Sequence, residues 1–403
     1  MKKSGMDSEL LSQWIKTPLD AIATTTSGGT PNRKQPDFYG GGIPWVKSGE
    51  LNDSYIFETE ETITQEGLKN SSAKLFPAGT LLIAMYGATV GKTAILKIPA
   101  ATNQAVCGIS PDTERADSDF LRYYLISERE ELLSQRYGGA QPNISQNIIR
   151  NFTVQLPPLP EQRKIAAILS TVQKAIEQQE QIIQTTTELK KALMQKLFTE
   201  GLRGEKQKKT EIGLVPESWE VLEFDKFVTL QRGYDLRKQD FKRGKIPVIG
   251  ATQVIGYHDK ANVKGPGVTV VRSGSSAGMP LFINEDFWAH NVVLYVKNYH
   301  GNIPKFVYYK IQSLDLTKYR QGVAVPTLNR NTFASLKIAI PAPDDQQRIT
   351  EALDSVENKS LFAVKKKTLL ENLFRTLLHQ LMTAQVRIEE CCYGDINNEQ
   401  NAH

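Results

Sequence analysis

Two long stretches without glycine or proline constrain the fold of this 403-residue chain more than any other feature. They run over residues 161–199 and 344–386, and each follows a proline-rich segment. Apolar residues recur in both at alternating steps of four and three, and the two series are 184 residues apart at every member. Such a heptad pattern predicts two long helices whose seams pack on each other. The alternative is that each amphipathic helix lies on a globular core of its own.

The two series are apolar at both ends and polar in the middle. The predicted seam residues are Ile165, Leu169, Val172, Ile176, Ile183, Leu193 and Leu197 in the first helix, and Ile349, Leu353, Val356, Leu370, Phe374, Leu377 and Leu381 in the second.

The heptads belong to an internal repeat that covers most of the chain. The two copies share, in the same order, Trp14 and Trp219, Gly28 and Gly233, the tyrosine pairs 123–124 and 308–309, and Pro157 and Pro341. Short apolar runs punctuated by glycine, proline and threonine precede each helix and predict strands and turns. We therefore expect β-rich domains over 1–155 and 206–340, helices within 156–205 and 341–388, and a polar, disordered tail over 389–403.

Composition and charge narrow the classes of protein. No apolar run approaches the ~20 residues of a membrane-spanning helix, and the start, MKKSGMDSEL, lacks the apolar stretch of a secretory signal. Three cysteines, two of them adjacent, provide neither a disulfide framework nor metal-ligand spacing. We therefore expect a cytoplasmic protein without a membrane partner. Within a net charge of +5, residues 206–340 carry +9, which favours a polyanionic partner over a merely solvated lysine-rich surface.

Two glycine-rich motifs resemble nucleotide- or cofactor-binding loops but differ in their details. Gly87–Thr93 has three residues between its glycines where a phosphate-binding loop has four, and Tyr86 replaces the first glycine. The second copy has Met279-Pro280 in place of Lys-Thr, so we interpret the element as a glycine turn between strands. Residues 38–42 fit the F-x-G-x-G of methyltransferases, but an extended Ile-Pro-Trp segment follows instead of a helix. Because no catalytic constellation or metal-ligand spacing remains, we predict no catalytic residue and no metal site.

Three segments carry a resemblance to one family. They are Leu156–Arg163, the helix end KKALMQKLFTEGLRG, and Glu211–Trp219, which opens the second copy. With the tandem architecture, they make the chain similar to the specificity subunits of type I restriction-modification systems. The resemblance implies an α+β fold in which two β-rich target recognition domains are each followed by a long helix, and the two helices pack as an antiparallel coiled coil.

The resemblance also implies a function. Each recognition domain would read one half of a bipartite, asymmetric DNA target, and the helices would set the spacing of the halves. Two adenine-methyltransferase subunits would dock on the chain and bind S-adenosylmethionine themselves, while restriction subunits would bring ATP and Mg²⁺. The chain would be non-catalytic, bind no cofactor and act in a bacterial or archaeal cytoplasm. Two alternatives remain open, a protein-binding scaffold of two modules and a fused methyltransferase or nuclease.

DNA contacts require cationic side chains for phosphates and Arg, Asn, Gln or Lys for base edges. In the second copy, the expected contacts are Arg232, Tyr234, Arg237, Lys238, Lys242, Arg243, Lys245, Arg272, Ser273, Asn329, Arg330 and Asn331. In the first copy, they are Arg33, Lys34, Lys47, Ser48, Tyr86, Lys92, Gln141, Asn143, Ser145 and Gln146.

Overall fold

The computed structural model describes residues 14–135, 143–202, 204–322 and 324–388. The chain divides into two compact units, which are described separately below. Unit 1 comprises residues 1–178 and 366–403, and unit 2 comprises residues 179–365. Each unit contains one β-rich region, the first half of the long helix that follows that region, and the second half of the other long helix. The predicted 389–403 tail lies outside the described residues.

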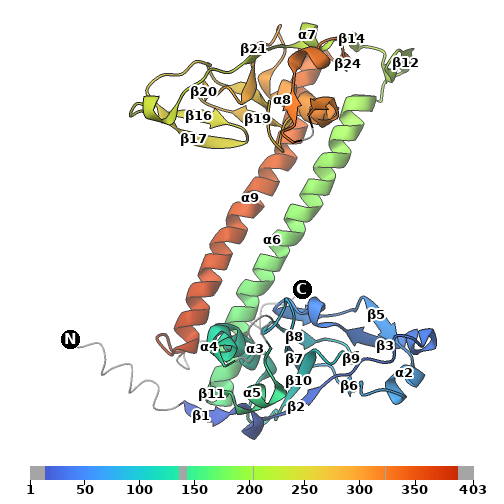
Figure 1. The fold of residues 1–403 in the computed structure, drawn as a ribbon, viewed down its shortest axis with the longest axis vertical. Coiled ribbons are helices and arrows are strands. Elements are labelled where there is room, and N and C mark those ends of the chain that lie inside the picture. The colour runs from blue at the N-terminus through green and yellow to red at the C-terminus, as the bar shows by residue number, and fades with distance from the viewer. Residues whose placement is uncertain (1–13, 136–142, 203, 323, 389–403) are drawn as a thin grey trace, which may run out of the picture. The chain divides into compact units, whose positions relative to one another are not determined.

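The two long helices are α6 (Leu159–Glu200) and α9 (Pro343–Met382) (Figure 1). Each begins slightly earlier than its glycine- and proline-free stretch, because the first turn of a helix has free N–H groups and tolerates proline. Helix α6 ends before Gly201, whose φ of +72° is the left-handed conformation that terminates helices. Helix α9 ends four residues before the stretch does.

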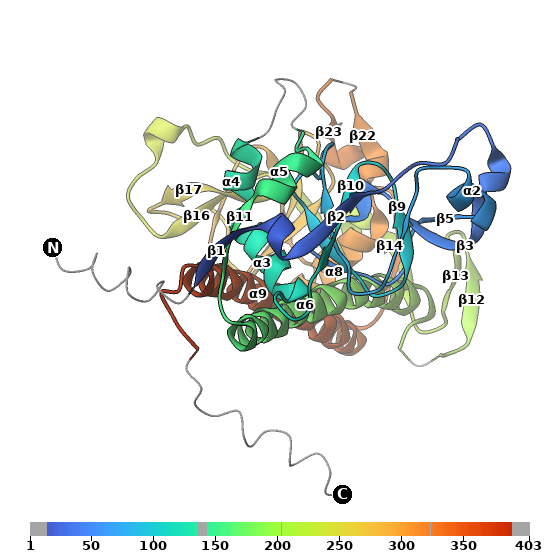
Figure 2. The ribbon, with the colours of Figure 1, turned by 90° about the horizontal axis from the view of Figure 1, so that it is seen from below.

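The predicted antiparallel pairing of these helices is confirmed within each unit. In unit 1 the first half of α6 packs on the second half of α9, and Leu169 shares a core with Leu381. In unit 2 the second half of α6 packs on the first half of α9, and Leu197 shares a core with Leu353. Both views show the helices side by side (Figure 2). All the predicted seam residues are buried or half-buried.

Unit 1 contains two main sheets and a strand pair. A five-stranded sheet has the order β2 (Ala23–Ser27), β10 (Val106–Pro111), β7 (Leu81–Ala84), β8 (Thr93–Leu96) and β4 (Ser54–Ile56). A four-stranded sheet has the order β5 (Glu61–Ile63), β3 (Tyr39–Val46), β9 (Ala100–Thr102) and β6 (Leu75–Phe76). The antiparallel pair consists of β1 (Ile15–Pro18) and β11 (Thr153–Leu156). Besides the long helices, the described part of unit 1 contains the α-helices α2 (Gln65–Lys69), α3 (Ser118–Ser127), α4 (Arg129–Ser134) and α5 (Gln146–Asn151).

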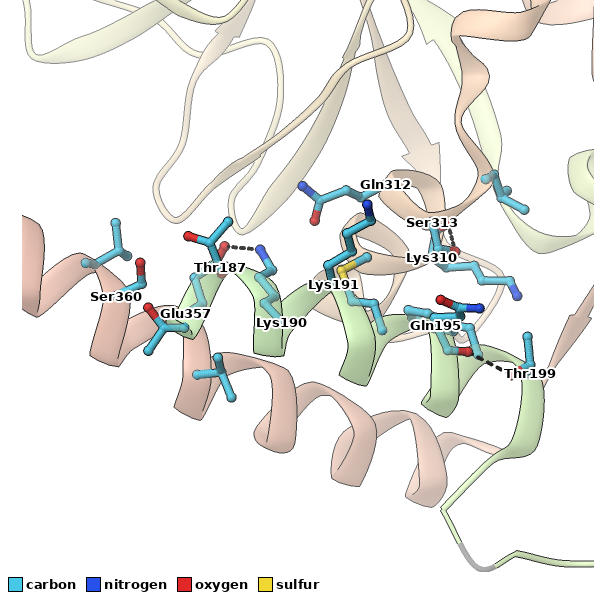
Figure 3. A pocket seen from close by; sticks show the side chains of 16 residues that line it. Thr187, Lys190, Lys191, Gln195, Thr199, Lys310, Gln312, Ser313, Glu357 and Ser360 are labelled. Atoms are coloured by element: carbon cyan, nitrogen blue, oxygen red, sulfur yellow. Dashed lines mark hydrogen bonds and ion pairs between the residues drawn. The ribbon is translucent and has the colours of Figure 1, made fainter. Parts of the chain in front are cut away.

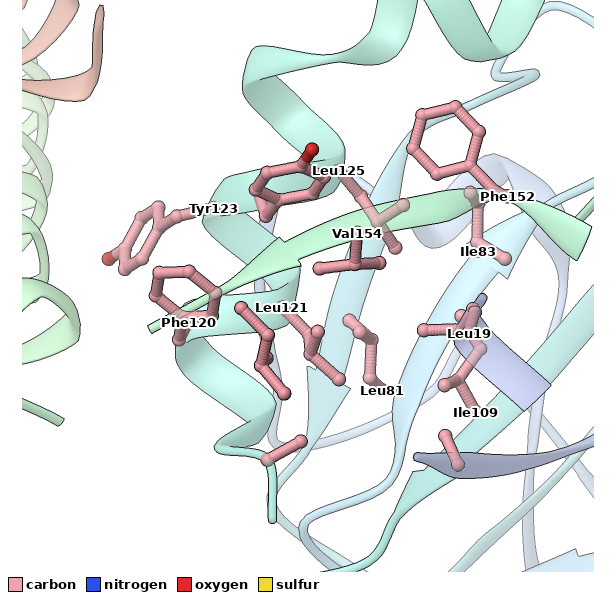
Figure 4. Close-up of a cluster of buried hydrophobic side chains, with 14 of the residues drawn as sticks. Leu19, Leu81, Ile83, Ile109, Phe120, Leu121, Tyr123, Leu125, Phe152 and Val154 are labelled. Atoms are coloured by element: carbon pink, nitrogen blue, oxygen red, sulfur yellow. The ribbon is translucent and has the colours of Figure 1, made fainter. Parts of the chain in front are cut away.

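The main core of unit 1 lies between α3 and the five-stranded sheet (Figure 4). Phe120 and Leu121 of α3 are fully buried there against Leu81 and Ile109 of the sheet. The same core includes Leu169 of α6. Because apolar burial stabilises by about 25 cal/mol per Å², this shared core attaches the β-rich region to the long helices.

Unit 2 repeats this plan with fewer strands in its two main sheets. A four-stranded sheet has the order β15 (Thr229–Arg232), β21 (Val293–Asn298), β18 (Gly267–Val271) and β19 (Pro280–Ile283). A three-stranded sheet has the order β17 (Gln253–His258), β16 (Ile246–Gly250) and β20 (Trp288–Ala289). Three strand pairs complete the unit: β14 (Glu220–Glu223) with β24 (Lys337–Ile340), β12 (Gln207–Thr210) with β13 (Gly213–Pro216), and β22 (Arg320–Gln321) with β23 (Thr327–Leu328). Helices α7 (Phe224–Phe227) and α8 (Pro304–Leu314) lie in this unit.

Each long helix begins with the same buried contact. The Gln162 Oε1 atom accepts a hydrogen bond from the Asp117 amide at the start of α3 (2.9 Å). The Gln346 Oε1 atom accepts one from the Ile303 amide at the start of α8 (3.0 Å). Both glutamines also donate to the carbonyl of the proline five residues earlier. The repeat therefore extends to individual hydrogen bonds.

A second contact corrects the predicted alignment of the tyrosines. The hydroxyls of Tyr123 and Tyr309 bond to matching helix positions, namely Ser170 and Gln173 for the first and Asp354 and Glu357 for the second. Tyr123 therefore corresponds to Tyr309, and the predicted match of pairs 123–124 and 308–309 is wrong by one residue. The error arises because adjacent tyrosines in both copies permit two alignments, and only the hydrogen-bonding partners distinguish them.

The glycine-rich motif at 87–93 is the predicted turn between strands. Strands β7 and β8 pair antiparallel on either side of it, and Gly87 and Gly91 have φ of +88° and +76°. In unit 2 the connection from β18 to β19 has the same form, with Gly274 and Gly278 at +97° and +91°. Since non-glycine residues rarely adopt these angles, the paired glycines are explained by the turn.

Candidate nucleic-acid interface

An open cleft of about 710 Å³ in unit 2 brings together several of the predicted DNA-contacting residues. We call it the arginine cleft. Its lining residues are Gln231, Arg232, Gly233, Tyr234, Asp235, Arg272, Asn291, Leu294, Gln321, Thr327, Leu328, Asn329 and Arg330. They come from the end of β15 and the residues after it, the residue after β18, the connection from β20 to β21, β21 itself, and the β22–β23 hairpin with the residues after it.

Strand register explains why two arginines meet at this cleft. Strand β21 lies between β15 and β18, and Leu294 of β21 pairs with both Arg232 and Val270. Arg272 follows β18 and its amide donates to the Val292 carbonyl (2.8 Å). The two guanidinium groups therefore flank the start of one strand, although they are forty residues apart in the sequence.

The charge of the cleft is strongly positive. Burial and the nearby charge of Arg232 lower the pKa of Arg272 from its ordinary value. The carboxylate among the lining residues is that of Asp235, which already accepts a hydrogen bond from Asn291 (2.7 Å). Three arginines thus face one carboxylate, and such an arrangement attracts phosphate or the acceptor edge of guanine.

A hydrogen-bonded segment holds the third arginine in place. The Leu328 amide donates to the Arg272 carbonyl (2.7 Å), and Arg330 Nη1 donates to the Leu230 carbonyl (2.6 Å). Ser273 forms an isolated bridge with Thr327 beside the cleft. Asn331 lines a separate small cavity, so it does not share the cleft with the arginines.

Tyr234 is the aromatic residue of the cleft and is 47% exposed. Its hydroxyl accepts a hydrogen bond from Gln231 (2.8 Å), which orients the ring at the cleft surface. Its carbonyl accepts from the Trp288 indole (3.4 Å), which connects the cleft to the three-stranded sheet. An exposed ring beside guanidinium groups can stack on a base or contact a sugar.

The remaining basic residues of the 237–245 segment do not line the cleft. Arg237 pairs with Asp240 (2.8 Å), and both are well exposed. The others are exposed on the connection from β15 to β16, namely Lys238, Lys242, Arg243 and Lys245. The cluster that the sequence predicts as one group is therefore divided between the cleft and this connection.

In unit 1, acidic neighbours engage two of the predicted cations. Arg33 pairs with Glu61 (2.6 Å) and lies over the Tyr39 ring. Lys47 pairs with Glu60 (2.6 Å) and Glu61 (3.1 Å). The hydrogen bond from Arg33 outweighs burial and lowers the pKa of Glu61. These pairs neutralise local charge in unit 1.

Other predicted contacts of unit 1 have structural partners. Tyr86 forms an isolated bridge with Asn143. The Ser145 hydroxyl accepts from the Ile148 amide (3.2 Å) and caps α5, and Gln146 donates to the Thr25 carbonyl (2.9 Å).

The other four predicted DNA contacts of unit 1 have different surroundings. Lys92 lies 4.0 Å from Asp53. The Ser48 carbonyl accepts from the Thr89 hydroxyl (2.8 Å), and Lys34 is exposed. Gln141 lies outside the described residues.

Sequence reasoning missed five polar residues of the arginine cleft: Gln231, Asp235, Asn291, Gln321 and Thr327. Gln231, Asp235 and Thr327 lie within two residues of predicted residues and could have been found by proximity. Asn291 and Gln321 come from distant segments with no charge signal. In the described part of the chain, no group of His, Cys, Asp and Glu is placed to hold a metal ion, and no helix is long and apolar enough to cross a membrane.

Comparisons with known proteins agree on one family. A family profile described as "Type I restriction modification DNA specificity domain" matches residues 12–187 and 216–372. The MjaVIII specificity subunit of Methanocaldococcus jannaschii, a type I restriction enzyme subunit, is 26% identical over 302 residues, which are 68% of this chain and 71% of that protein. The MjaIX specificity subunit of the same organism is 28% identical over 254 residues, 60% of this chain and 58% of that protein.

The fold is also found among solved structures. The S subunit of a type I restriction-modification system from M. genitalium superposes with a TM-score of 0.68, covering 91% of this chain and 96% of that chain at 16% identity.

Proposed function

The chain belongs to the type I restriction modification DNA specificity family, and from this premise we propose that its two β-rich regions each read one half of a bipartite DNA target. The two half-sites would differ in sequence because the two β-rich regions present different side chains to the DNA. The chain itself supplies recognition, and methylation and cleavage belong to partner subunits. Two methyltransferase subunits would bind S-adenosylmethionine, and restriction subunits would use ATP and Mg²⁺.

The observation that carries this proposal is the repeated attachment of a β-rich region to the start of a long helix. Gln162 and Gln346 make equivalent buried contacts, and Tyr123 and Tyr309 make equivalent hydroxyl contacts. Two readers attached in the same way to paired helices suit a target with two half-sites, since a duplex presents the same groove again about 34–36 Å further on.

The helix pair supports a role as the spacer. Helix α6 has 42 residues, or roughly 63 Å at ~1.5 Å per residue, so it is long enough to connect readers placed on successive turns of DNA. Within each unit its seam is shared with α9. The alternative, a protein-binding scaffold of two modules, would need neither helices of this length nor a cleft lined by three arginines.

The arginine cleft is the part of unit 2 best suited to contact DNA. The test uses the chain reconstituted with its methyltransferase subunits and a set of duplexes, after the methylated sequence has been found by sequencing modified adenines. Arg272→Ala should weaken binding to the true site by about 1–3 kcal/mol and relax preference at one position of one half-site if the arginine contacts a base. If it contacts phosphate, binding should weaken for all sequences and the salt dependence should fall by about one unit of slope.

Arg348→Ala provides the matched control, because Arg348 is an arginine of the same unit that pairs with Asp345 on α9, outside the cleft and outside the predicted DNA contacts. We expect its effect on binding to be small. A reconstituted complex that binds unrelated duplexes equally well would refute the reader hypothesis as a whole.

The spacer role has its own test. Gln179 and Ala363 are equivalent buried seam positions, 6% and 2% exposed, so a seven-residue heptad inserted after both keeps the seam in register. The insertion adds about 10 Å of helix. We expect the preferred gap between half-sites to grow by about three base pairs while both half-sites stay the same. An unchanged gap would rule out the helix pair as the spacer.

A further inference from the structure

Unit 2 buries a lysine that has no anionic partner. Lys310 on α8 is 6% exposed, and no hydrogen bond or ion pair of its ammonium is found in the described part of the chain. Its Nζ atom lies 5.0 Å from the Phe198 ring centre and 5.8 Å from that of Trp219. Burial lowers the pKa of Lys310 to about 8. A buried ammonium without a counter-ion is costly, and proteins retain one where it has a use.

Lys310 lines an open pocket of about 800 Å³ between α6, α8 and α9 of unit 2 (Figure 3). We call it the Lys310 pocket. Lys190 and Lys191 of α6 also line it, and Glu357 is the carboxylate among its described lining residues. Glu357 is already engaged by Lys190 (2.7 Å) and by the Tyr309 hydroxyl (2.6 Å). The pocket therefore keeps an excess of positive charge.

Apolar side chains complete the pocket. Met194, Phe198 and Leu314 line it beside the lysines. At its edge Leu361 of α9 is 54% exposed, and the next residue, Phe362, is 70% exposed. Exposed apolar residues around a positive pocket are typical of a surface that a protein covers.

The positions of unit 1 that are equivalent to Lys310 and Lys190 are aromatic. Because Tyr123 corresponds to Tyr309, Tyr124 of unit 1 is the equivalent of Lys310. The 184-residue offset between the heptad series makes Phe374 the equivalent of Lys190. Tyr124 is 4% exposed, and Phe374 packs on Tyr123 with ring centres 5.9 Å apart. The same fold is thus built in unit 1 with a continuous apolar core, so Lys310 and Lys190 are not required by the architecture.

We propose that the Lys310 pocket receives an acidic side chain, flanked by apolar residues, from a methyltransferase subunit that docks on unit 2. The ammonium of Lys310 pairs with the incoming carboxylate. Leu361 and Phe362 contact the apolar residues of the partner that flank this carboxylate. Unit 1 lacks this pair of lysines, so the helix pair offers two chemically different docking surfaces. This inference rests on the proposed function, which supplies the partner.

The experiment measures how many methyltransferase subunits bind the full chain, by native mass spectrometry over a concentration series. The wild-type chain should bind two. Lys310→Met keeps an unbranched side chain, one heavy atom shorter, and removes the charge. It should therefore weaken one of the two binding steps at least about tenfold and leave the other unchanged. Lys209→Met removes an exposed lysine of β12 outside the pocket and should leave both steps unchanged.

Hydrogen exchange identifies the affected surface. In the wild-type complex, amides of residues 186–199 should be protected on docking, and Lys310→Met should lose that protection at concentrations that still occupy the other surface. Circular dichroism of Lys310→Met excludes misfolding, and Lys191→Glu, at an exposed position of the pocket, gives a second variant that should weaken the same step. If the wild-type chain binds no methyltransferase subunit, the proposed function is lost together with this inference. If both variants bind two subunits as tightly as wild type, the pocket inference alone is refuted.

Discussion

Replacing Lys310 by methionine should make unit 2 more stable at neutral pH. The substitution retains the unbranched side chain that lies on Phe198 and Trp219 and removes the buried charge. Methionine also contacts aromatic rings favourably through its sulfur. The variant therefore removes a cost of folding and shortens the side chain by only one heavy atom.

The magnitude follows from the lowered pKa. The ordinary lysine pKa of 10.5 falls to about 8 for Lys310 in the folded chain, and at about 1.4 kcal/mol per pH unit this corresponds to about 3 kcal/mol. The contacts of the ammonium with two aromatic rings return about 1 kcal/mol. We expect Lys310→Met to stabilise the chain by about 2 kcal/mol at pH 7.

The sign of the pH dependence is determined by the direction of the pKa change. Because the folded chain holds this proton less tightly than the unfolded chain, wild-type stability at this group rises as pH increases from 8 towards 10.5. The cost is fully present below pH 8 and has disappeared above pH 10.5. The advantage of the methionine variant should therefore shrink across this window.

The assay is urea unfolding of both proteins between pH 7 and pH 10.5, with hydrogen exchange of α8 amides to localise the effect. The charged groups of α6 and α9 that line the pocket together with Lys310 are Lys190, Lys191 and Glu357. They are present in both proteins, so the difference between the two isolates Lys310. A variant that is less stable than wild type at pH 7, or whose advantage does not change with pH, would refute the account of a buried, unpaired ammonium.

Three other predictions can be checked by urea unfolding. Gly278→Ala should destabilise the fold by more than about 2 kcal/mol, because its φ is +91° and a Cβ would lie 2.9 Å from the Thr317 amide nitrogen. Gly274→Ala is the control, since Gly274 has φ +97° but open space around it, and it should cost only about 1 kcal/mol. Equal effects of the two variants would contradict the role of the clash. Tyr309→Phe should cost about 1–3 kcal/mol by removing the hydroxyl between two carboxylates, and a neutral result would mean that the hydroxyl does not join α8 to α9. Gln346→Leu should cost about 2–4 kcal/mol, since the buried Gln346 side chain loses three hydrogen bonds. An unchanged unfolding midpoint would contradict the attachment that we describe.

The helices and their pairing could be predicted because a heptad is a local pattern with one simple solution. Steps of four and three place apolar side chains on one face, and burial of that face requires a partner. The glycine turns could be predicted for a similar reason. A pair of glycines between two apolar runs favours a turn with positive φ angles, and Gly274 and Gly278 adopt such angles. In each case the physical cause lies within a few residues of the pattern.

The arginine cleft could be predicted only in part. Arg232 and Tyr234 were found from the local density of basic residues, but Lys242 and its exposed neighbours were included for the same reason and lie outside the lining. The density of basic residues along the sequence does not show which of them will line the cleft and which will lie on the exposed connection from β15 to β16. Asn291 and Gln321 reach the cleft through sheet register, and nothing in their own segments signals it.

The sequence alone determined that this chain is a doubled α+β protein with two long paired helices, because repeats and periodicity survive without knowledge of distant contacts. The tertiary structure decided which polar groups share one surface and which lysine is buried without a partner. Lys310 has the same chemistry in the sequence as any exposed lysine. Its lowered pKa and its pocket arise from Phe198, Trp219 and α9, which only folding brings around it.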